Sequence, residues 1–340
     1  MFTDPQIAEQ FDIRFPQDED AEQIANLRNR CTMALVGVPS SNAIEVRSSW
    51  NFDGMDREKD FRVVWDGDKP VAYAEVWNDD PPFIRAWVNA YVDPDYQNQG
   101  LGTYITRWAE QRAHETFEKA PADAKLLVVS GAYAHHREAI ELLENEGYEK
   151  TRTFWTMKID LDHDIPEPQF PPNITMTSYA ETNDLRAMAN ASHEAFLDHW
   201  GYVGTTEERR LENWAEWTNP EKSPSYDPTT FWLAMDGDEI AGMSLCTPSS
   251  NENKNHGYVY TLGVRRPWRR QGLARAMLYY TFREMKKRGK EAVLLDVDSE
   301  SLTGATRLYE KAGMFVFREG VDYEKIMRDG TDYRRLSVDE

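Results

Sequence analysis

The hexapeptide QNQGLG at Gln97–Gly102 has a second, similar copy in the chain, RRQGLA at Arg269–Ala274. Each copy follows an apolar run that is typical of a β-strand and ends in valine, at Val92 and at Val264. After each copy, apolar residues recur at helical spacing. A strand, a glycine-containing loop and a helix N-terminus together bind phosphate well, because the first N–H groups of a helix are unpaired and its dipole is positive there. The sequence therefore predicts two such phosphate-binding arrangements.

Two further pairs of segments indicate that the duplication covers most of the chain. WDGDKPVAYAEV at Trp65–Val76 and MDGDEIAGMSLC at Met235–Cys246 both predict a β-hairpin with an Asp-Gly turn. LLENEGY at Leu142–Tyr148 matches LYEKAGM at Leu308–Met314. The three pairs occur in the same order at nearly constant separation, which is the pattern of a tandem duplication.

A proline-rich segment separates the two copies. His163–Asn173 contains four prolines, which interrupt helices and central strands. We expect an N-terminal domain at residues 1–162, a linker at 163–173 and a C-terminal domain at 174–335. Each copy predicts a hairpin followed by a strand–helix–strand unit. The expected fold class is therefore α/β, with a mixed, mostly antiparallel sheet flanked by helices in each domain.

The composition limits the classes of partner. The chain has 340 residues and a formal net charge of −20, whereas nucleic-acid binding requires a basic face. The N-terminus does not resemble a signal peptide, and no apolar run reaches the roughly 18 residues of a membrane span. Two cysteines, Cys31 and Cys246, fit a reducing compartment, so a cytoplasmic location without membrane partners is expected. The scattered histidines and cysteines predict no metal site, and the sequence leaves open whether the protein is a monomer or a homodimer.

Both hexapeptides fit the pattern [Q/R]-x-x-G-x-[G/A], and in each copy a segment of the LYEKAGM type follows. In this respect the chain resembles the GNAT superfamily of acyl-CoA-dependent N-acyltransferases. The tandem arrangement is similar to that of two-domain enzymes of the mycothiol synthase type. The resemblance implies two tandem GNAT-like domains, acetyl-CoA as the acyl donor, and direct attack by a primary amine of a small molecule.

The resemblance also implies the residues that bind the cofactor. In the C-terminal domain these are strand residues near the pantetheine arm and loop residues near the pyrophosphate, with Arg269 and Arg270 adding positive charge. Ser301 occupies a position where many members have an asparagine that contacts the cofactor, so the expected contact at this position is weaker. The implied C-terminal set is Leu262, Gly263, Val264, Arg269, Arg270, Gln271, Gly272, Leu273, Ala274 and Ser301. The implied second site in the N-terminal domain comprises Val92, Gln97, Gly100, Leu101 and Gly102.

The two domains differ at the position of the catalytic acid. Tyr309 matches the general-acid tyrosine of the family, which protonates the departing CoA thiolate. Leu143 aligns with Tyr309 and has no proton to donate. His135 and His136 nearby are interpreted as solvated residues at the start of a helix. We therefore expect a catalytic C-terminal domain and an N-terminal domain that at most binds CoA.

The acceptor site is less well defined by the sequence. His193, His199, Trp200 and Tyr260 lie where the resemblance places the acceptor site, and they are candidate substrate-binding residues. No single position identifies the general base. The alternative function is a non-catalytic, acyl-CoA-binding regulatory or sensor protein.

Overall fold

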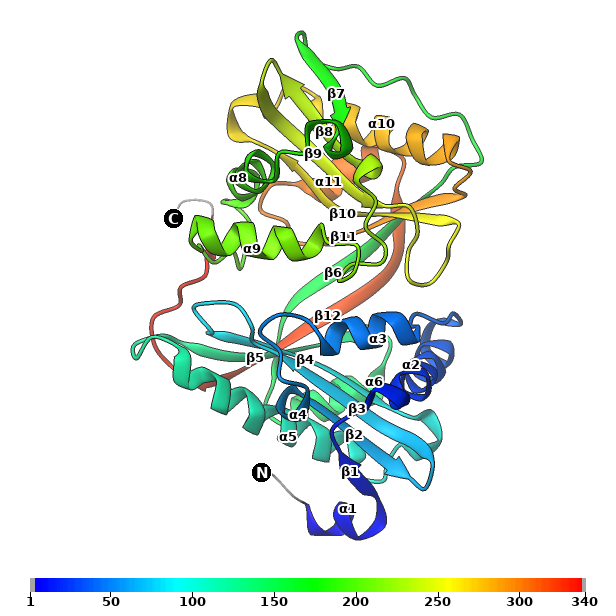
Figure 1. The fold of residues 1–340 in the computed structure, drawn as a ribbon, viewed down its shortest axis with the longest axis vertical. Helices are drawn as coiled ribbons and strands as arrows, with labels where there is room; N and C mark the ends of the chain where they lie inside the picture. The colour runs from blue at the N-terminus through cyan, green and yellow to red at the C-terminus, as the bar shows by residue number, and fades with distance from the viewer. Residues whose placement is uncertain (1–3, 338–340) are drawn as a thin grey trace. The chain divides into compact units, whose positions relative to one another are not determined.

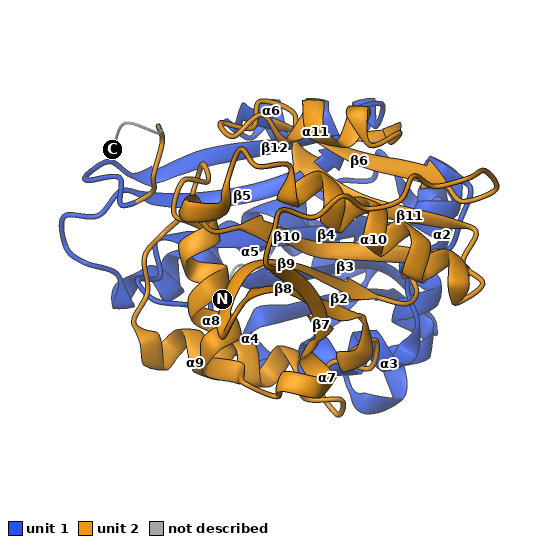
Figure 2. Ribbon diagram, turned by 90° about the horizontal axis from the view of Figure 1, so that it is seen from above, with its two compact units in different colours: residues 1–152, 320–333 blue, residues 153–319, 334–340 orange. Residues whose placement is uncertain are grey.

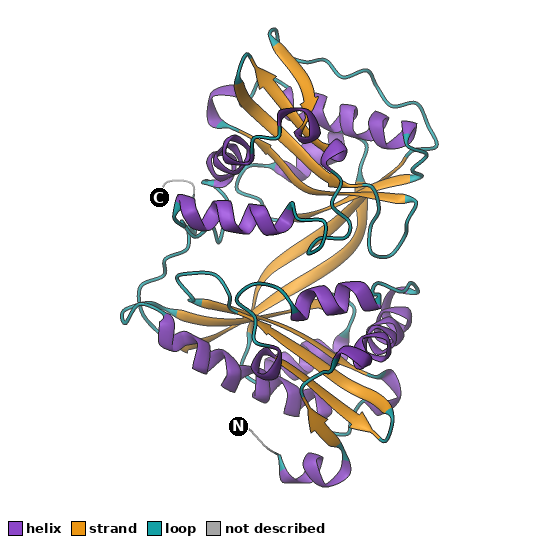
Figure 3. Cartoon of the chain, viewed as in Figure 1, coloured by secondary structure: helices purple, strands orange, loops and turns teal. Residues whose placement is uncertain are grey.

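The computed structural model describes residues 4–337. It divides into two compact units, which Figure 2 colours separately. Unit 1 comprises residues 1–152 and 320–333, and unit 2 comprises residues 153–319 and 334–340. Each unit contains a sheet with helices packed on its faces (Figure 3).

The sheet of unit 1 has the strand order β1-β2-β3-β4-β5-β12. Its strands are β1 (Asp12–Arg14), β2 (Phe61–Asp66), β3 (Lys69–Trp77), β4 (Arg85–Val92), β5 (Leu126–Tyr133) and β12 (Phe315–Arg328). Its helices are α1 (Pro5–Gln10), α2 (Ala21–Val36), α3 (Ala43–Trp50), α4 (Arg57–Asp60), α5 (Leu101–Thr116) and α6 (Arg137–Asn145) (Figure 1).

The sheet of unit 2 has the order β6-β11-β10-β9-β8-β7. Its strands are β6 (Glu149–Asp160), β7 (Ile174–Ser178), β8 (Phe231–Asp236), β9 (Glu239–Thr247), β10 (His256–Val264) and β11 (Ala292–Asp298). Its helices are α7 (Tyr179–Thr182), α8 (Leu185–Phe196), α9 (Glu207–Trp217), α10 (Leu273–Lys287) and α11 (Ala305–Lys311).

The expected fold class is confirmed in both units. The registers of β4 with β5 and of β10 with β11 are parallel, whereas the neighbouring hairpin strands pair antiparallel. The Asp-Gly turns join β2 to β3 and β8 to β9, and their glycines have positive φ, +56° at Gly67 and +59° at Gly237. Glycine has no Cβ, so it adopts this conformation at little cost, and the predicted hairpins form as expected.

The last strand of each sequence half pairs in the unit of the other half. Phe154–Asp160 of β6 pairs antiparallel with β11 in unit 2. Gly320–Arg328 of β12 pairs antiparallel with β5 in unit 1. No helix or strand occurs between Asp160 and Ile174, where the proline-rich linker lies. The duplicated halves of the sequence and the compact units therefore have different boundaries.

Two hydrophobic layers cover the opposite faces of the unit 2 sheet. Along β9, Met243 and Leu245 pack with α8 residues, while Cys246 packs with α10 residues. Such alternation is expected, because successive side chains of a strand point to opposite faces. On the α10 side, the apolar positions predicted from the helical spacing, Leu273, Met277, Phe282 and Met285, are all buried.

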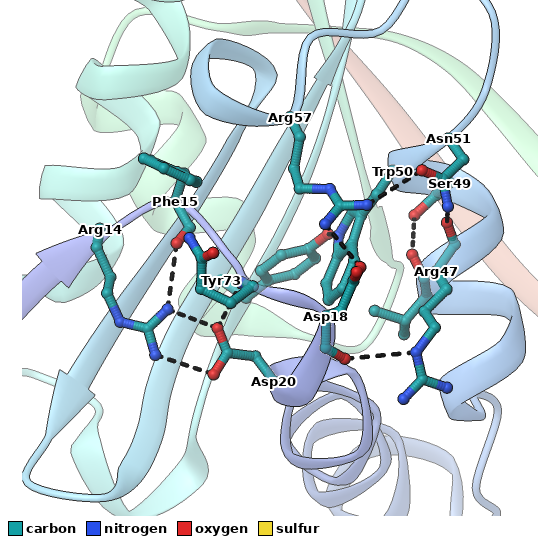
Figure 4. A network of polar contacts seen from close by, with 12 residues as sticks. Arg14, Phe15, Asp18, Asp20, Arg47, Ser49, Trp50, Asn51, Arg57 and Tyr73 are labelled. Atoms are coloured by element: carbon teal, nitrogen blue, oxygen red, sulfur yellow. Dashed lines mark hydrogen bonds and ion pairs between the residues drawn. The ribbon is translucent and has the colours of Figure 1, made fainter.

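In unit 1 the face under α2 and α3 is closed by a packed cluster with polar contacts (Figure 4). The indole Nε1–H of Trp50 donates to the hydroxyl of Tyr73 at 3.1 Å, and that hydroxyl donates to Glu75 at 3.2 Å. At the start of α2, the Arg14 guanidinium donates to both carboxylate oxygens of Asp20, at 2.5 and 2.9 Å. Trp50 and Tyr73 are 2% and 0% exposed, so large side chains fill this face.

Candidate active site

The two glycine loops have the same backbone conformation. In unit 1, φ is +60° at Asn98 and +83° at Gly100, directly before α5. In unit 2, φ is +64° at Arg270 and +85° at Gly272, directly before α10. A Cβ placed at Gly272 would meet no atom within 4 Å, so the space beside the first turn of α10 is open. This cradle fits a phosphate group bound by the N-terminal amides of α10.

We expected Arg269 to add positive charge for a ligand at this loop, but its guanidinium is hydrogen-bonded to protein groups. Its guanidinium donates to the carbonyls of Val264 (2.9 Å) and Ala195 (3.0 Å) and to the carboxylate of Asp198 (2.6 Å). Asp198 also accepts hydrogen bonds from Arg266, and these arginines hold the pKa of its carboxyl well below the usual range. Arg269 thus fixes the loop to the end of α8.

Gly263 allows α8 to approach β10 closely. A Cβ at this position would lie 2.9 Å from Ala195 Cβ and 2.9 Å from Phe196 Cε2. Any larger residue would therefore push the end of α8 away from the strand. The glycine thus has a clear packing role in addition to its predicted place along the cofactor.

A cavity opens where β10 and β11 diverge. Their parallel register ends at Val259 and Leu295, although β10 continues to Val264 and β11 to Asp298. On its other side, β10 remains paired with β9 through Val264. The cavity has a volume of about 250 Å³. Its lining residues are Phe154, Phe196, Asp198, His199, Trp200, Val259, Tyr260, Leu262, Leu295, Asp296, Val297, Asp298, Ser301, Leu302, Thr303, Ala305 and Tyr309.

This cavity is lined from both faces of the sheet. Leu295 and Val297 belong to the core beneath α10 and α11, which also contains Tyr309. Asp296 and Asp298 alternate with them along β11 and therefore point toward the opposite face. A group held between the diverging strands can accordingly be reached from one face while a side chain of α11 contacts it from the other.

Tyr309 lines the cavity and is 7% exposed. Within residues 4–337 its hydroxyl has no protein hydrogen-bond partner. Burial raises the pKa of Tyr309 to about 12, because the phenolate would lose its solvation. The hydroxyl is therefore protonated near neutral pH and can donate a proton to a group in the cavity.

The structure brings three of the four candidate substrate-binding residues together. His199, Trp200 and Tyr260 line the cavity. His193 does not belong to its lining, and its Nδ1 instead bonds to the hydroxyl of Tyr202. Ser301 also lines the cavity, with its hydroxyl 3.1 Å from that of Thr303.

Sequence reasoning missed six polar or aromatic residues of the cavity, namely Phe154, Phe196, Asp198, Asp296, Asp298 and Thr303. Asp296 and Asp298 could have been found from their alternation with apolar residues at the end of a buried strand. Asp198 directly precedes His199 but had no local signature. Phe154 lies in the first half of the sequence and reaches the cavity because β6 from Thr153 onward belongs to unit 2.

Unit 1 has a cavity of about 230 Å³ at the corresponding place, bordered by its glycine loop. Leu143 lines it, 5% exposed, where unit 2 has Tyr309. His136 also lines it and is half-buried rather than solvated, and burial lowers the pKa of its imidazole. None of the described lining residues comes from α2 or α3, so this cavity lacks the second face that unit 2 offers. Its lining residues are Ala90, Val92, Tyr96, Gln97, Asn98, Gly100, Gly102, Thr103, Ile105, Thr106, Ser130, Gly131, His136, Glu138, Ala139, Leu142 and Leu143.

Two features are absent from the described residues, 4–337. None of the helices is both long and apolar enough to cross a lipid bilayer. No three or more His, Cys, Asp or Glu side chains are grouped in a way that could hold a metal ion.

The chain is similar to several proteins. At 27% identity it matches a mycothiol acetyltransferase from Saccharopolyspora erythraea, over 65% of this chain and 70% of the relative. It is 28% identical to a mycothiol acetyltransferase from Salinispora arenicola, over 75% and 78%. A crystal structure of a GCN5-related N-acetyltransferase from Sphaerobacter thermophilus superposes with a TM-score of 0.78 and 34% identity, covering 95% of this chain and 98% of that one.

The tandem fold also occurs in a tandem GNAT protein from the clavulanic acid biosynthesis pathway, with a TM-score of 0.69 at 15% identity, covering 94% of this chain and 100% of that chain. The family model of the Acetyltransferase (GNAT) family matches twice, at residues 21–124 and 186–314. Together the two matches cover more than half of the chain, one around each glycine loop. The protein therefore belongs to the GNAT family of acetyltransferases and carries two tandem domains of that fold.

Proposed function

We propose that unit 2 transfers an acetyl group from acetyl-CoA to a primary amine of a small molecule, and that unit 1 does not catalyse. The observation that carries the proposal is the cavity between β10 and β11, which places Tyr309 on one face and His199, Asp296 and Asp298 toward the other. The names of the relatives from Saccharopolyspora and Salinispora support a small-molecule acceptor.

Acetyl-CoA would be held along β10 and the loop that follows it. The open cradle at Gly272 and the N-terminal amides of α10 suit the pyrophosphate, and the exposed Arg270 adds positive charge. The edge of β10 from Leu262 to Val264, where pairing with β11 has ended, suits the amide groups of the pantetheine arm. When bound, acetyl-CoA supplies an activated acetyl thioester.

Tyr309 is the proposed proton donor to the sulfur atom that leaves. The residue lines the cavity, and its hydroxyl keeps its proton near neutral pH because its pKa is raised to about 12. A thiolate has an ordinary pKa of about 8.5 and grows more basic in a buried site, so a tyrosine in contact with it can protonate it. Leu143 offers no such proton in unit 1, which supports a non-catalytic role for that unit.

A CoA-release assay across a set of amines tests this function. Kanamycin, spermidine and D-glucosamine represent aminoglycosides, polyamines and amino sugars, and a lysine-containing peptide represents protein substrates. We expect amine-dependent release of CoA with at least one of the three small molecules and little with the peptide. Tight binding of acetyl-CoA without turnover on any amine would instead favour a regulatory, acyl-CoA-binding protein.

Replacing Gly272 with glutamate should weaken acetyl-CoA binding by at least about 100-fold, or roughly 2.7 kcal/mol. The new carboxylate would project into the open cradle and repel the pyrophosphate. Gly289→Glu is the matched control, because Gly289 also has a positive φ (+76°) and open space around its Cβ position. Isothermal titration calorimetry measures the affinity. Equal affinities in the two variants would contradict the phosphate site.

A further inference from the structure

We propose that His199 is the general base of this site and takes the proton from the acceptor amine. This inference rests on the proposed function, because it assigns a second catalytic residue to the same cavity. Two observations support the inference. The imidazole lies at the cavity, and the other proton acceptors there are hydrogen-bonded to protein donors.

The backbone and the packing of α8 hold the imidazole of His199 in place. The residue follows the end of α8, where its amide N–H donates to the carbonyl of Phe196 at 3.0 Å. Its ring packs against the Phe196 ring with the centroids 4.3 Å apart. Asp198, the preceding residue, is fixed by Arg266 and Arg269 of the glycine-loop segment. The ring is therefore held at the cavity wall by contacts that do not involve its nitrogens.

The carboxylates of the cavity are already engaged with protein donors. Asp198 accepts from its two arginines, Asp296 accepts from the Tyr258 hydroxyl at 2.7 Å, and Asp298 accepts from the Glu300 amide at 2.9 Å. In contrast, neither ring nitrogen of His199 has a protein partner within residues 4–337. Among the acidic and imidazole side chains that line the cavity, His199 is thus the one whose proton-accepting atom has no protein donor within the described residues.

The surroundings of His199 keep its imidazole neutral. Burial lowers the pKa of His199, the positive charge of Arg269 lowers it further, and Asp198 and Asp298 partly oppose this shift. Since the pKa lies below the usual value of about 6.5, the ring is unprotonated at neutral pH and can accept a proton.

His199 and Tyr309 together then carry out every proton transfer that the reaction requires. Amines of this kind arrive as R–NH3⁺, and His199 accepts the first proton so that the nitrogen lone pair can attack the thioester carbonyl carbon. The C–N bond forms and the C–S bond breaks, while Tyr309 gives its proton to sulfur. The nitrogen loses its second proton, which restores the Tyr309 hydroxyl. The net products are R–NH–CO–CH3, CoA–SH and one proton, which His199 releases to solvent.

The test measures kcat/KM against pH for the wild type, His199→Gln and His199→Ala, with kanamycin, spermidine and D-glucosamine as acceptors. We expect His199→Gln to lower kcat at least about 100-fold and to abolish the acid limb of the profile. Added imidazole should restore part of the activity of His199→Ala. The affinity for acetyl-CoA should be unchanged, and His163→Gln, an exposed histidine of the linker, serves as the control.

The outcomes separate the inference from the proposed function. A wild-type protein that acetylates none of the three amines overturns both. If the wild type is active and His199→Gln keeps both the rate and the acid limb of the pH profile, the assignment of His199 as general base is wrong, while the proposed function stands. An NMR titration of the imidazole needs no acceptor, and a pKa of His199 above its ordinary value would also overturn the assignment.

Discussion

Tyr309→Phe should lower kcat by about 100-fold to 10,000-fold while leaving the affinity for acetyl-CoA nearly unchanged. The substitution removes only the hydroxyl, and the ring continues to fill its place in the core beneath α10 and α11. Because that hydroxyl has no protein hydrogen-bond partner within residues 4–337, its removal leaves no protein group unsatisfied. The loss should therefore appear in turnover rather than in folding.

Tyr279→Phe is the matched control for this experiment. Tyr279 lies on α10, and its hydroxyl makes only a long hydrogen bond, 3.4 Å, to the carbonyl of Lys311. Steady-state kinetics, acetyl-CoA titration and thermal melting should separate the two variants. The wild type should also show no loss of rate from Tyr309 ionisation until the pH approaches about 12. Equal kcat values for Tyr309→Phe and the wild type would contradict the assigned role.

A chain that ends at Glu319 should fail to form a stable unit 1, although it retains all of the N-terminal half of the sequence. It lacks Gly320–Arg328, which pairs with β5, and with it the buried Val321 and Tyr323. Burial of one large apolar side chain contributes about 1.5–3 kcal/mol, whereas a domain is stable by only about 5–15 kcal/mol. The deletion also leaves β5 with an unpaired edge, which favours aggregation.

A chain that ends at Tyr333 is the control, because it loses the same residues 334–340 but keeps the whole unit 1 segment. Hydrogen–deuterium exchange at Leu126–Tyr133 reports directly on β5. We expect rapid exchange and low solubility for the chain ending at Glu319, and protection for the chain ending at Tyr333. Equal protection of β5 in both chains would show that β12 is dispensable for unit 1.

The local features of the fold could be predicted from the sequence because they depend on neighbouring residues. The spacing of Leu273, Met277 and Phe282 identified α10, and the Asp-Gly pairs identified the hairpin turns. The partner of a strand is set by distant residues instead. The terminal strand of each half has similar local chemistry, so nothing within 151–159 or 314–320 specified that β6 pairs with β11 and β12 with β5.

The candidate site shows the same limit. Tyr309 and the glycine loop were identified by short motifs, and Tyr309 lines the cavity. The partners of Arg269 could not be read from the motif, because Asp198 lies 71 residues earlier in the chain. Phe154 could not be assigned to unit 2 without knowledge of the strand pairing. Residues separated along the sequence become neighbours only through tertiary packing.

The closed face of unit 1 has a consequence for redesign of the protein. A Leu143→Tyr substitution would add a hydroxyl to a cavity that receives no lining residue from α2 or α3 among the described residues. Opening the packing of Trp50 and Tyr73 alone would create space without adding a hydroxyl at position 143. A centre in unit 1 like the one proposed for unit 2 would therefore require both changes together.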